Sequence, residues 1–281
     1  MWLVFSVVSG ALYAAESLLQ RFHLRKQPDI WTFALFYSLI GALISFPFML
    51  ASPTIPSSPG VWAVVALNGL LIVLNNYLFF KATGLLEISV VNSLMKIRLV
   101  WVLLFGVVIL SDPFNWLKLA GTVCAMLAGW IILHSFTKPG NSRGVIFVLA
   151  LTLVNASIII LFKYLLSYFN AMSLTFFADF LPAALFTVLI APQSVSRIKG
   201  IFKDDWRIIF LASTLGAFSS IAMNLALSLH DAASVVVINE VFLILVLVGE
   251  HIYLKEREHT WIKVVSVSLA LAGAILIQVS A

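Results

Sequence analysis

The chain has 281 residues, of which 62% are hydrophobic and 10% are charged, and its formal net charge is +5. Its mean hydropathy is +1.08. Ordinary soluble domains carry about 25% charged residues, so this composition excludes one. The basic residues are spread over short segments without forming a patch, so the charge does not indicate nucleic-acid binding. We expect an integral membrane protein whose main surroundings are the lipid bilayer.

Ten segments are apolar over about 20 residues, the length that crosses a hydrocarbon core of about 30 Å. Runs this long and continuous are typical of helices rather than of barrel strands. The first segment has no basic residue before Arg21, which favours an uncleaved helix over a signal peptide. We predict an all-α integral membrane bundle with ten transmembrane helices, at residues 2–22, 30–51, 61–82, 88–110, 114–135, 144–167, 171–191, 207–229, 232–254 and 259–279.

Two stretches of the chain repeat each other at a distance of 145 positions. Ser89-Val90-Val91 recurs as Ser234-Val235-Val236, and Trp116-Leu117-Lys118 recurs as Trp261-Ile262-Lys263. A small residue at every fourth position also recurs in both copies, which is typical of close helix packing: Gly121, Ala125 and Gly129 in the first, and Ser266, Ala270 and Ala274 in the second. These stripes favour packing within the chain over dimerisation, and both a monomer and a homodimer stay open.

The turn-forming residues around Pro139 divide the chain into two halves of five spans each. We predict a first five-helix repeat at 1–137, a connecting loop at 138–143 and a second five-helix repeat at 144–281. Because each half has an odd number of spans, the second half enters the membrane from the other side. The duplication is therefore predicted to be inverted.

Thirteen of the seventeen Lys and Arg residues lie in the loops that follow odd-numbered spans or at the span ends beside those loops. By the positive-inside rule these loops are cytoplasmic, and both termini lie outside. We expect the protein in a bacterial cytoplasmic (inner) membrane.

Lys255-Glu256-Arg257, after the apolar segment 242–254, resembles the Gly-Glu-Arg ending of a helix in the EamA type of the drug/metabolite transporter (DMT) superfamily. Ala272-Gly273 in the last span resembles the same family. This resemblance implies two inverted five-helix halves and membrane transport. The first half departs from the pattern, with Ser111 or Asp112 at the acidic position and Pro113 after it. Relatives are usually described with cytoplasmic termini, whereas the loop charges here predict the reverse.

Ionisable residues inside spans are costly when they face lipid, so each is a candidate for function. In span four, Lys96 and Arg98 occupy the repeat positions of Val241 and Leu243, and in span nine Glu240 occupies that of Met95. These charges are therefore not part of the shared scaffold. Asn92 lies four residues before Lys96 on the same helix face, so we rank Lys96 first for substrate binding and Arg98, the better bidentate group, close behind. Glu240 is a further candidate.

Glu16, Asp179 and Glu240 are the candidates for proton coupling, which stays open. When the two repeats are aligned so that Arg21 matches Lys163 of span six, Asp179 matches Tyr37. Lys163 itself either functions or extends to the interface. The alternative for all these charges is that they pair with one another and lock the bundle.

Neutral polar and aromatic residues in the spans add a second group of substrate-binding candidates. For the amides the alternative is hydrogen bonding between helices, and for the indole it is core packing. The group comprises Asn75, Asn76, Tyr77, Trp101, Asn224 and Asn239, with Asn155 as a further amide in span six.

These features predict a secondary active transporter that moves a small anionic or zwitterionic metabolite, such as an amino acid, a carboxylate or a phosphorylated compound, by alternating access. The sequence has no phosphate-binding Walker motif, so we expect no ATP hydrolysis. The single Cys124 offers no metal-ligand spacing, and we expect no metal, no cofactor and no enzymatic activity. The alternatives are an exporter of amphipathic drugs or cations, which Lys96 and Arg98 would repel, a membrane-embedded enzyme and a channel.

Overall fold

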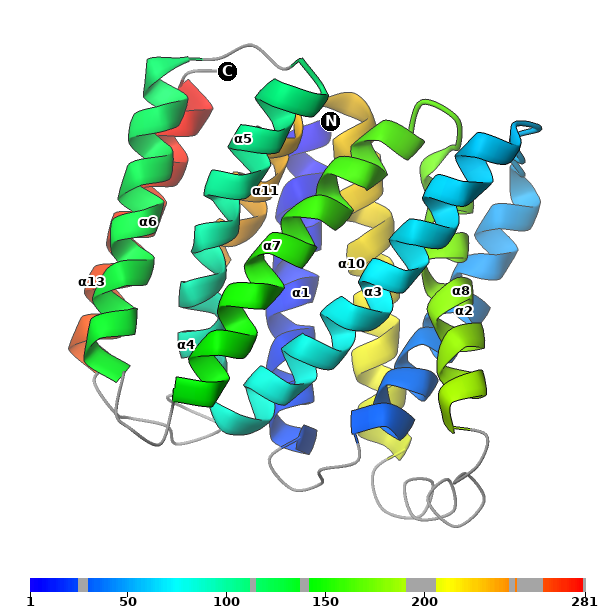
Figure 1. Ribbon diagram of the computed structural model, residues 1–281, viewed down its shortest axis with the longest axis horizontal. Coiled ribbons are helices and arrows are strands. Elements are labelled where there is room, and N and C mark those ends of the chain that lie inside the picture. Colours follow the sequence, from blue (N-terminus) through cyan, green and yellow to red (C-terminus); the bar gives the residue numbers. More distant parts are fainter. Residues whose placement is uncertain are drawn as a thin grey trace.

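The structure is a computed structural model that describes residues 1–24, 30–111, 115–136, 142–190, 206–242, 246 and 260–279. Within these residues it is all-helical (Figure 1), as predicted. The helices are α1 (Trp2–Leu24), α2 (Ile30–Ala51), α3 (Pro59–Leu85), α4 (Ile88–Leu94), the 3-10 helix η1 (Met95–Ile97), α5 (Arg98–Ile109), α6 (Trp116–Phe136), α7 (Ser142–Leu165), α8 (Ala171–Ile190), α10 (Trp206–Leu229), α11 (Ala232–Val241) and α13 (Thr260–Val279).

Seven helical segments among the described residues are long and apolar enough to cross a membrane. They begin at Trp2, Trp31, Pro59, Val90, Ser142, Ala171 and Trp206. Two shorter apolar helices, Trp116–Ala128 and Val264–Gly273, lie where the fifth and tenth spans are predicted. The predicted span at 232–254 is described only through α11, Phe242 and Val246. An all-α membrane bundle is therefore confirmed, and the count of ten stays a prediction.

The fourth predicted span is not one regular helix. It consists of α4, η1 and α5, so a short 3-10 turn at Met95–Ile97 interrupts residues 88–110. The second repeat also departs from the α pattern at the matching place, 145 positions later. There α11 ends at Val241, and the amide of Phe242 donates to the carbonyl of Asn239 three residues back, at 3.4 Å. A 3-10 turn in mid-helix often marks a functional hinge, and interrupted helices near the midplane are typical of transporter sites.

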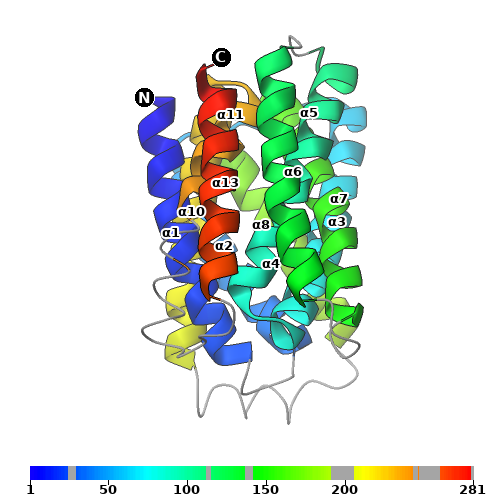
Figure 2. The same cartoon turned by 90° about the vertical axis from the view of Figure 1, so that its left-hand side faces the viewer.

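The closest helix pairs each take one helix from either half of the chain. The helix α1 packs most extensively on α10, α3 on α7, α2 on α8 and α6 on α13 (Figure 1). Figure 2 shows α6 and α13 side by side at one edge of the bundle. The first helix of each half thus packs on the third helix of the other half. A two-fold axis between the halves would relate these two contacts to each other. In Figure 1, α1 and α7 begin at opposite ends of the bundle, and α1 begins at the end where α13 finishes.

Small residues allow these close approaches. On α1 and α10 the hydroxyl groups of Ser9 and Ser219 are 3.3 Å apart, and the Ser219 hydroxyl donates to the Ser9 carbonyl at 2.9 Å. On the predicted stripe of α13, the Ser266 hydroxyl donates to the carbonyl of Ala128 on α6 at 2.8 Å. Side chains this short let the backbones come together. At least Ser266 of the stripe therefore serves packing within the chain.

Gly10 of α1 offers a direct test of this packing. A Cβ atom there would lie 2.6 Å from the Phe242 ring and 2.7 Å from the Asn239 carbonyl oxygen, whereas a Cβ at Gly84 would meet nothing within 4 Å. Alanine favours helices over glycine by about 1 kcal/mol, but overpacking costs about 1–3 kcal/mol. We expect Gly10→Ala to lower the melting temperature of the purified protein and Gly84→Ala to leave it unchanged or raise it. Equal melting temperatures for the two variants would contradict this packing.

Candidate functional site

Two adjoining cavities lie between the α1–α10 pair and the α3–α7 pair. The first, which we call the Glu16 cavity, has a volume of about 110 Å³ and the second, the Phe162 cavity, about 170 Å³. Helices α1, α5 and α7 line both, while α3 lines only the first and α10 only the second. The residues that line both cavities are Tyr13, Arg98 and Asn155.

The inverted repeat relates one cavity to the other. Positions of α1 and α7 correspond at a distance of 142 residues, which is the register that matches Arg21 to Lys163. In this register Tyr13 corresponds to Asn155, and each of the two lines both cavities. Positions of α3 and α10 correspond at 144 residues. The α3 residues of the Glu16 cavity are Asn75, Asn76, Phe79 and Phe80, and their partners, Ser219, Ser220, Met223 and Asn224, all line the Phe162 cavity.

The two cavities are therefore the two halves of one space, with Tyr13 and Asn155 at its centre. Their chemistry differs, however. The positions held by Glu16 and Gln20 on α1 are held by Ile158 and Phe162 on α7. At these two positions, consequently, the Glu16 cavity carries a carboxyl group and an amide, whereas the Phe162 cavity carries two apolar side chains.

Arg98 supplies the positive group of this space. It is the first residue of α5, directly after the 3-10 turn, and it is 7% exposed. Its Nη1 donates to Oδ1 of Asn155 at 2.7 Å, and Nδ2 of Asn155 donates to Oδ1 of Asn75 at 3.0 Å. The amides thus form a chain from α5 through α7 to α3 that fixes the orientation of the guanidinium group. A guanidinium group held in this way suits a carboxylate or a phosphate.

Glu16 supplies the acidic group and is 4% exposed. Its Oε1 accepts from the Tyr37 hydroxyl at 2.6 Å and from the Gln20 amide at 2.7 Å. Gly216 of α10 lies against this group, since a Cβ there would be 3.1 Å from the Glu16 carboxyl carbon. Two donors from α1 and α2 therefore satisfy a carboxyl group that would otherwise be costly to bury.

Asp179 of α8 lies at the edge of the same cluster. A Cβ at Gly41 would be 2.8 Å from Oδ2 of Asp179, and Asp179 interacts electrostatically with both Tyr37 and Glu16. Among the described residues, Oδ2 of Asp179 has no hydrogen-bond partner. Tyr37 and Asp179, which occupy equivalent repeat positions, thus meet where α2 packs on α8. The predicted acids Glu16 and Asp179 belong to one cluster.

Three predicted amides line the Phe162 cavity or its margin. Asn239 donates to the Ser9 hydroxyl at 2.8 Å, and Asn224 donates to the Thr175 hydroxyl at 2.9 Å. Asn92 accepts from the Tyr13 hydroxyl at 3.4 Å and lines a small adjoining cavity together with Asn239. Oδ1 of Asn224 is buried and has no partner among the described residues.

Besides Asn92, three predicted binding residues with described side chains line neither of the two main cavities. Tyr77 stacks on Trp31 at 5.1 Å between ring centroids, and the Trp101 ring lies 6.2 Å from that of Phe105 in the packed core. Lys96 is 2% exposed within η1. The prediction that Lys96 is the first candidate for substrate binding depends on a regular helix, in which Asn92 and Lys96 share one face. The 3-10 turn at Met95–Ile97 breaks that regularity. Arg98 is thus the cation at the cavities.

The remaining predicted candidate, Glu240, lies on α11, and its side chain is outside the described residues. Three further residues at the Glu16 cavity were not predicted as site residues: Tyr13, Gln20 and Tyr37. A signal was present for two of them, because Tyr13 precedes Glu16 by three residues and Gln20 follows it by four, which places all three on one helix face.

The sequence pattern described as the EamA-like transporter family matches the chain twice, at residues 1–134 and 142–279. A solved structure described only as "Crystal structure of protein" is 16% identical, with 98% of this chain and 97% of that chain covered and a TM-score of 0.68. At this identity it shows a similar fold alone. No curated protein matches the chain.

A double-mutant cycle tests the bond between Arg98 and Asn155. A hydrogen bond to a charged group contributes about 1.5–3 kcal/mol, so we expect a coupling free energy of about that size between Arg98→Met and Asn155→Leu in reversible unfolding. As a control, Arg98→Met and Asn68→Leu, whose positions line no common cavity, should be additive within about 0.5 kcal/mol. Additivity of the first pair would show that Asn155 does not hold Arg98.

Proposed function

Because the chain belongs to the EamA-like transporter family and is a multi-pass membrane transporter, we propose that it is a secondary active transporter of a small anionic or zwitterionic metabolite. The family predicted from the sequence, the EamA type of the DMT superfamily, is confirmed by the double match. Membership of a transporter family implies transport rather than catalysis. The substrate and the coupling ion are our proposal.

The position of Arg98 is the observation that carries this proposal. Its guanidinium group borders both cavities and is oriented by Asn155, at the centre of the space between the two repeats. A buried cation at that place repels a cationic substrate and attracts an anionic group. Carboxylates and phosphates both match the planar fork of donors. The amides of Asn75 and Asn76 add neutral donors and acceptors beside it.

The size of the space favours a small substrate. The volumes of about 110 and 170 Å³ lie below the range of about 300–1,000 Å³ that is typical of ligand pockets. The apolar side chains of Ile158 and Phe162 line only one of the two cavities. We therefore propose that the anionic group binds at Arg98 and that any apolar part of the substrate lies toward Phe162.

Glu16 is the proposed proton site. It faces the same space as Arg98, so a proton and a substrate that bind there influence each other through charge. Asp179 lies near Glu16 and Tyr37 and supplies a second carboxyl group within the cluster. A carboxyl group of this kind inside a membrane bundle is typical of proton relays.

The exchange of helices between the halves supports the proposal of alternating access. The substrate space lies between two helix pairs, α1–α10 and α3–α7, each packed tightly within itself. Rocking one pair against the other opens the space first to one side and then to the other. We propose the cytoplasmic membrane as the location, with the basic loops inside and both termini outside.

The Arg98 proposal is tested by ligand-dependent thermal shifts of the purified protein. The panel contains amino acids, dicarboxylates and sugar phosphates, with polyamines as the cationic comparison. We expect one or more of the anionic or zwitterionic members to raise the melting temperature of the wild type. This shift should vanish in Arg98→Gln and survive in Lys81→Met, a matched removal of a cation outside the cavities. Stabilisation by polyamines alone, or an unchanged shift in Arg98→Gln, would refute an anion site at Arg98.

Proton coupling is tested in proteoliposomes with the ligand found in that panel. In Glu16→Gln we expect accumulation driven by a pH gradient to be lost, because the amide cannot take up a proton, while exchange of labelled for unlabelled substrate continues. Arg98→Gln should lose both activities. Gradient-driven accumulation at the wild-type rate in Glu16→Gln would exclude Glu16 as the coupling group.

A further inference from the structure

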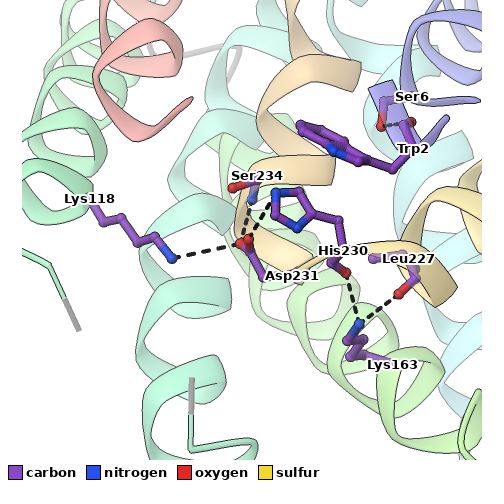
Figure 3. Close-up of polar contacts among 8 residues, drawn as sticks. All are labelled: Trp2, Ser6, Lys118, Lys163, Leu227, His230, Asp231 and Ser234. Atoms are coloured by element: carbon purple, nitrogen blue, oxygen red, sulfur yellow. Dashed lines mark hydrogen bonds and ion pairs between the residues drawn. The ribbon is translucent and has the colours of Figure 1, made fainter. Parts of the chain in front are cut away.

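Two cations at opposite ends of the bundle make equivalent contacts. Arg21, near the end of α1, donates from Nη1 to the carbonyl of Thr83 in the last turn of α3. Lys163, near the end of α7, donates from Nζ to the carbonyl oxygens of Leu227 at 2.7 Å and His230 at 2.8 Å, at the end of α10 (Figure 3). Both cations thus bind carbonyl oxygens at a helix C-terminus, which lack partners within the helix and carry partial negative charge.

The inverted repeat relates these contacts at both partners. Arg21 and Lys163 are 142 positions apart, the register of α1 and α7. Thr83 and Leu227 are 144 positions apart, the register of α3 and α10 in which the cavity residues correspond. Because the repeat is inverted, the two contacts lie at opposite ends of the substrate space. At one end, Gln20, the residue before Arg21, lines the Glu16 cavity. At the other end, Leu227, which accepts from Lys163, lines the Phe162 cavity.

Each contact joins the two helix pairs that enclose the space. Arg21 of the α1–α10 pair binds α3, and Lys163 of the α3–α7 pair binds α10. By contrast, α1 and α3 make few other contacts, as do α7 and α10. At each end, therefore, one cation joins two pairs that make few direct contacts with each other, while α8 packs on both α3 and α10.

The surroundings of Lys163 make this end a junction of several helices. His230 stacks on Trp2 of α1, with ring centroids 4.2 Å apart. Asp231 accepts from the amide of Ser234 at 2.9 Å, which caps α11, and lies 3.9 Å from Lys118 of α6 (Figure 3). The end of α10 is thus in contact with α1, α6 and α11.

From these contacts we infer that Arg21 and Lys163 are the latches of two gates, one at each end of the substrate space. Release of one latch lets the α1–α10 and α3–α7 pairs separate at that end while the other latch holds the opposite end closed. This inference rests on the proposed alternating access and adds to it the residues that close each side. A hydrogen bond from a cation to a helix end is strong enough to hold a gate and local enough to be broken alone.

Two reporter cysteines on a Cys124→Ala background test the latches. Phe79→Cys reports on the Glu16 cavity, one turn inward from Thr83, and Met223→Cys reports on the Phe162 cavity, one turn inward from Leu227. The measurement is the rate of labelling by a membrane-impermeant maleimide, added to either side of oriented vesicles.

We expect Lys163→Met to raise the labelling rate about tenfold at position 223 when the reagent is added on the side where α10 ends, and to leave the rate at position 79 unchanged. Arg21→Met should raise it to a similar degree at position 79, from the opposite side only. A tenfold change in labelling rate lies within the range of about 5- to 150-fold by which one site of a protein usually influences another.

Three controls separate gating from general loosening. Lys163→Arg and Arg21→Lys keep a cationic donor and should label as the wild type does. Lys81→Met removes a cation near the end of α3 without removing a latch and should change neither reporter. If Arg21→Met does not fold, Arg21→Gln takes its place, and the same selective pattern is required. Unchanged rates, or equal increases at both reporters, would overturn the inference.

The labelling needs no substrate, so its result is independent of the Arg98 proposal. Selective labelling together with an unchanged ligand shift in Arg98→Gln would retain the latches and refute the anion site. Loss of the shift without selective labelling would do the reverse.

Discussion

Hydrocarbon offers no hydrogen-bond partner, and this constraint determines where polar groups occur in the bundle. Each buried donor or acceptor is costly unless another helix supplies its complement. The Glu16 carboxyl group is satisfied by Tyr37 and Gln20, the Arg98 guanidinium group by Asn155, and the carbonyl oxygens at the α10 end by Lys163. These polar groups therefore lie between the helices, where partners are available.

The repeat supplies the geometry within which these contacts form. Because the first helix of each half packs on the third helix of the other, neither half closes the central space alone. The space is consequently lined by equivalent positions of both halves, and a change at one position alters only one side of it. Gln20 and Phe162 are such a pair. A duplicated scaffold can in this way acquire a site with two different halves while its backbone stays nearly symmetric.

Much of the fold could be predicted from hydropathy, because spans must be long and apolar. Most helix ends lie within two or three residues of the prediction. The 3-10 turn at Met95–Ile97 could not be predicted, since no glycine or proline marks it, and beside it Arg98 rather than Lys96 lines the two cavities. Glu16 and Asp179 could be identified because ionisable residues are rare in spans. Tyr37 and Tyr13 could not, because tyrosine is common in packed cores and only the neighbouring helix reveals its partner.

The contrast between Glu16 with Gln20 and Ile158 with Phe162 has a kinetic consequence for the proposed cycle. The two half-reactions of a symmetric carrier would have equal barriers, and its half-saturation concentration would be the same on both faces. Here a substrate that leaves past the carboxyl group and one that leaves past the phenyl ring cross unlike surroundings. Equilibrium is unaffected, since no structure can favour one direction without an energy source. Without a driving gradient, the maximal rate and the half-saturation concentration must therefore differ between the two faces by the same factor. Such a carrier works equally fast in both directions when substrate is scarce, and faster in one direction only when substrate is abundant.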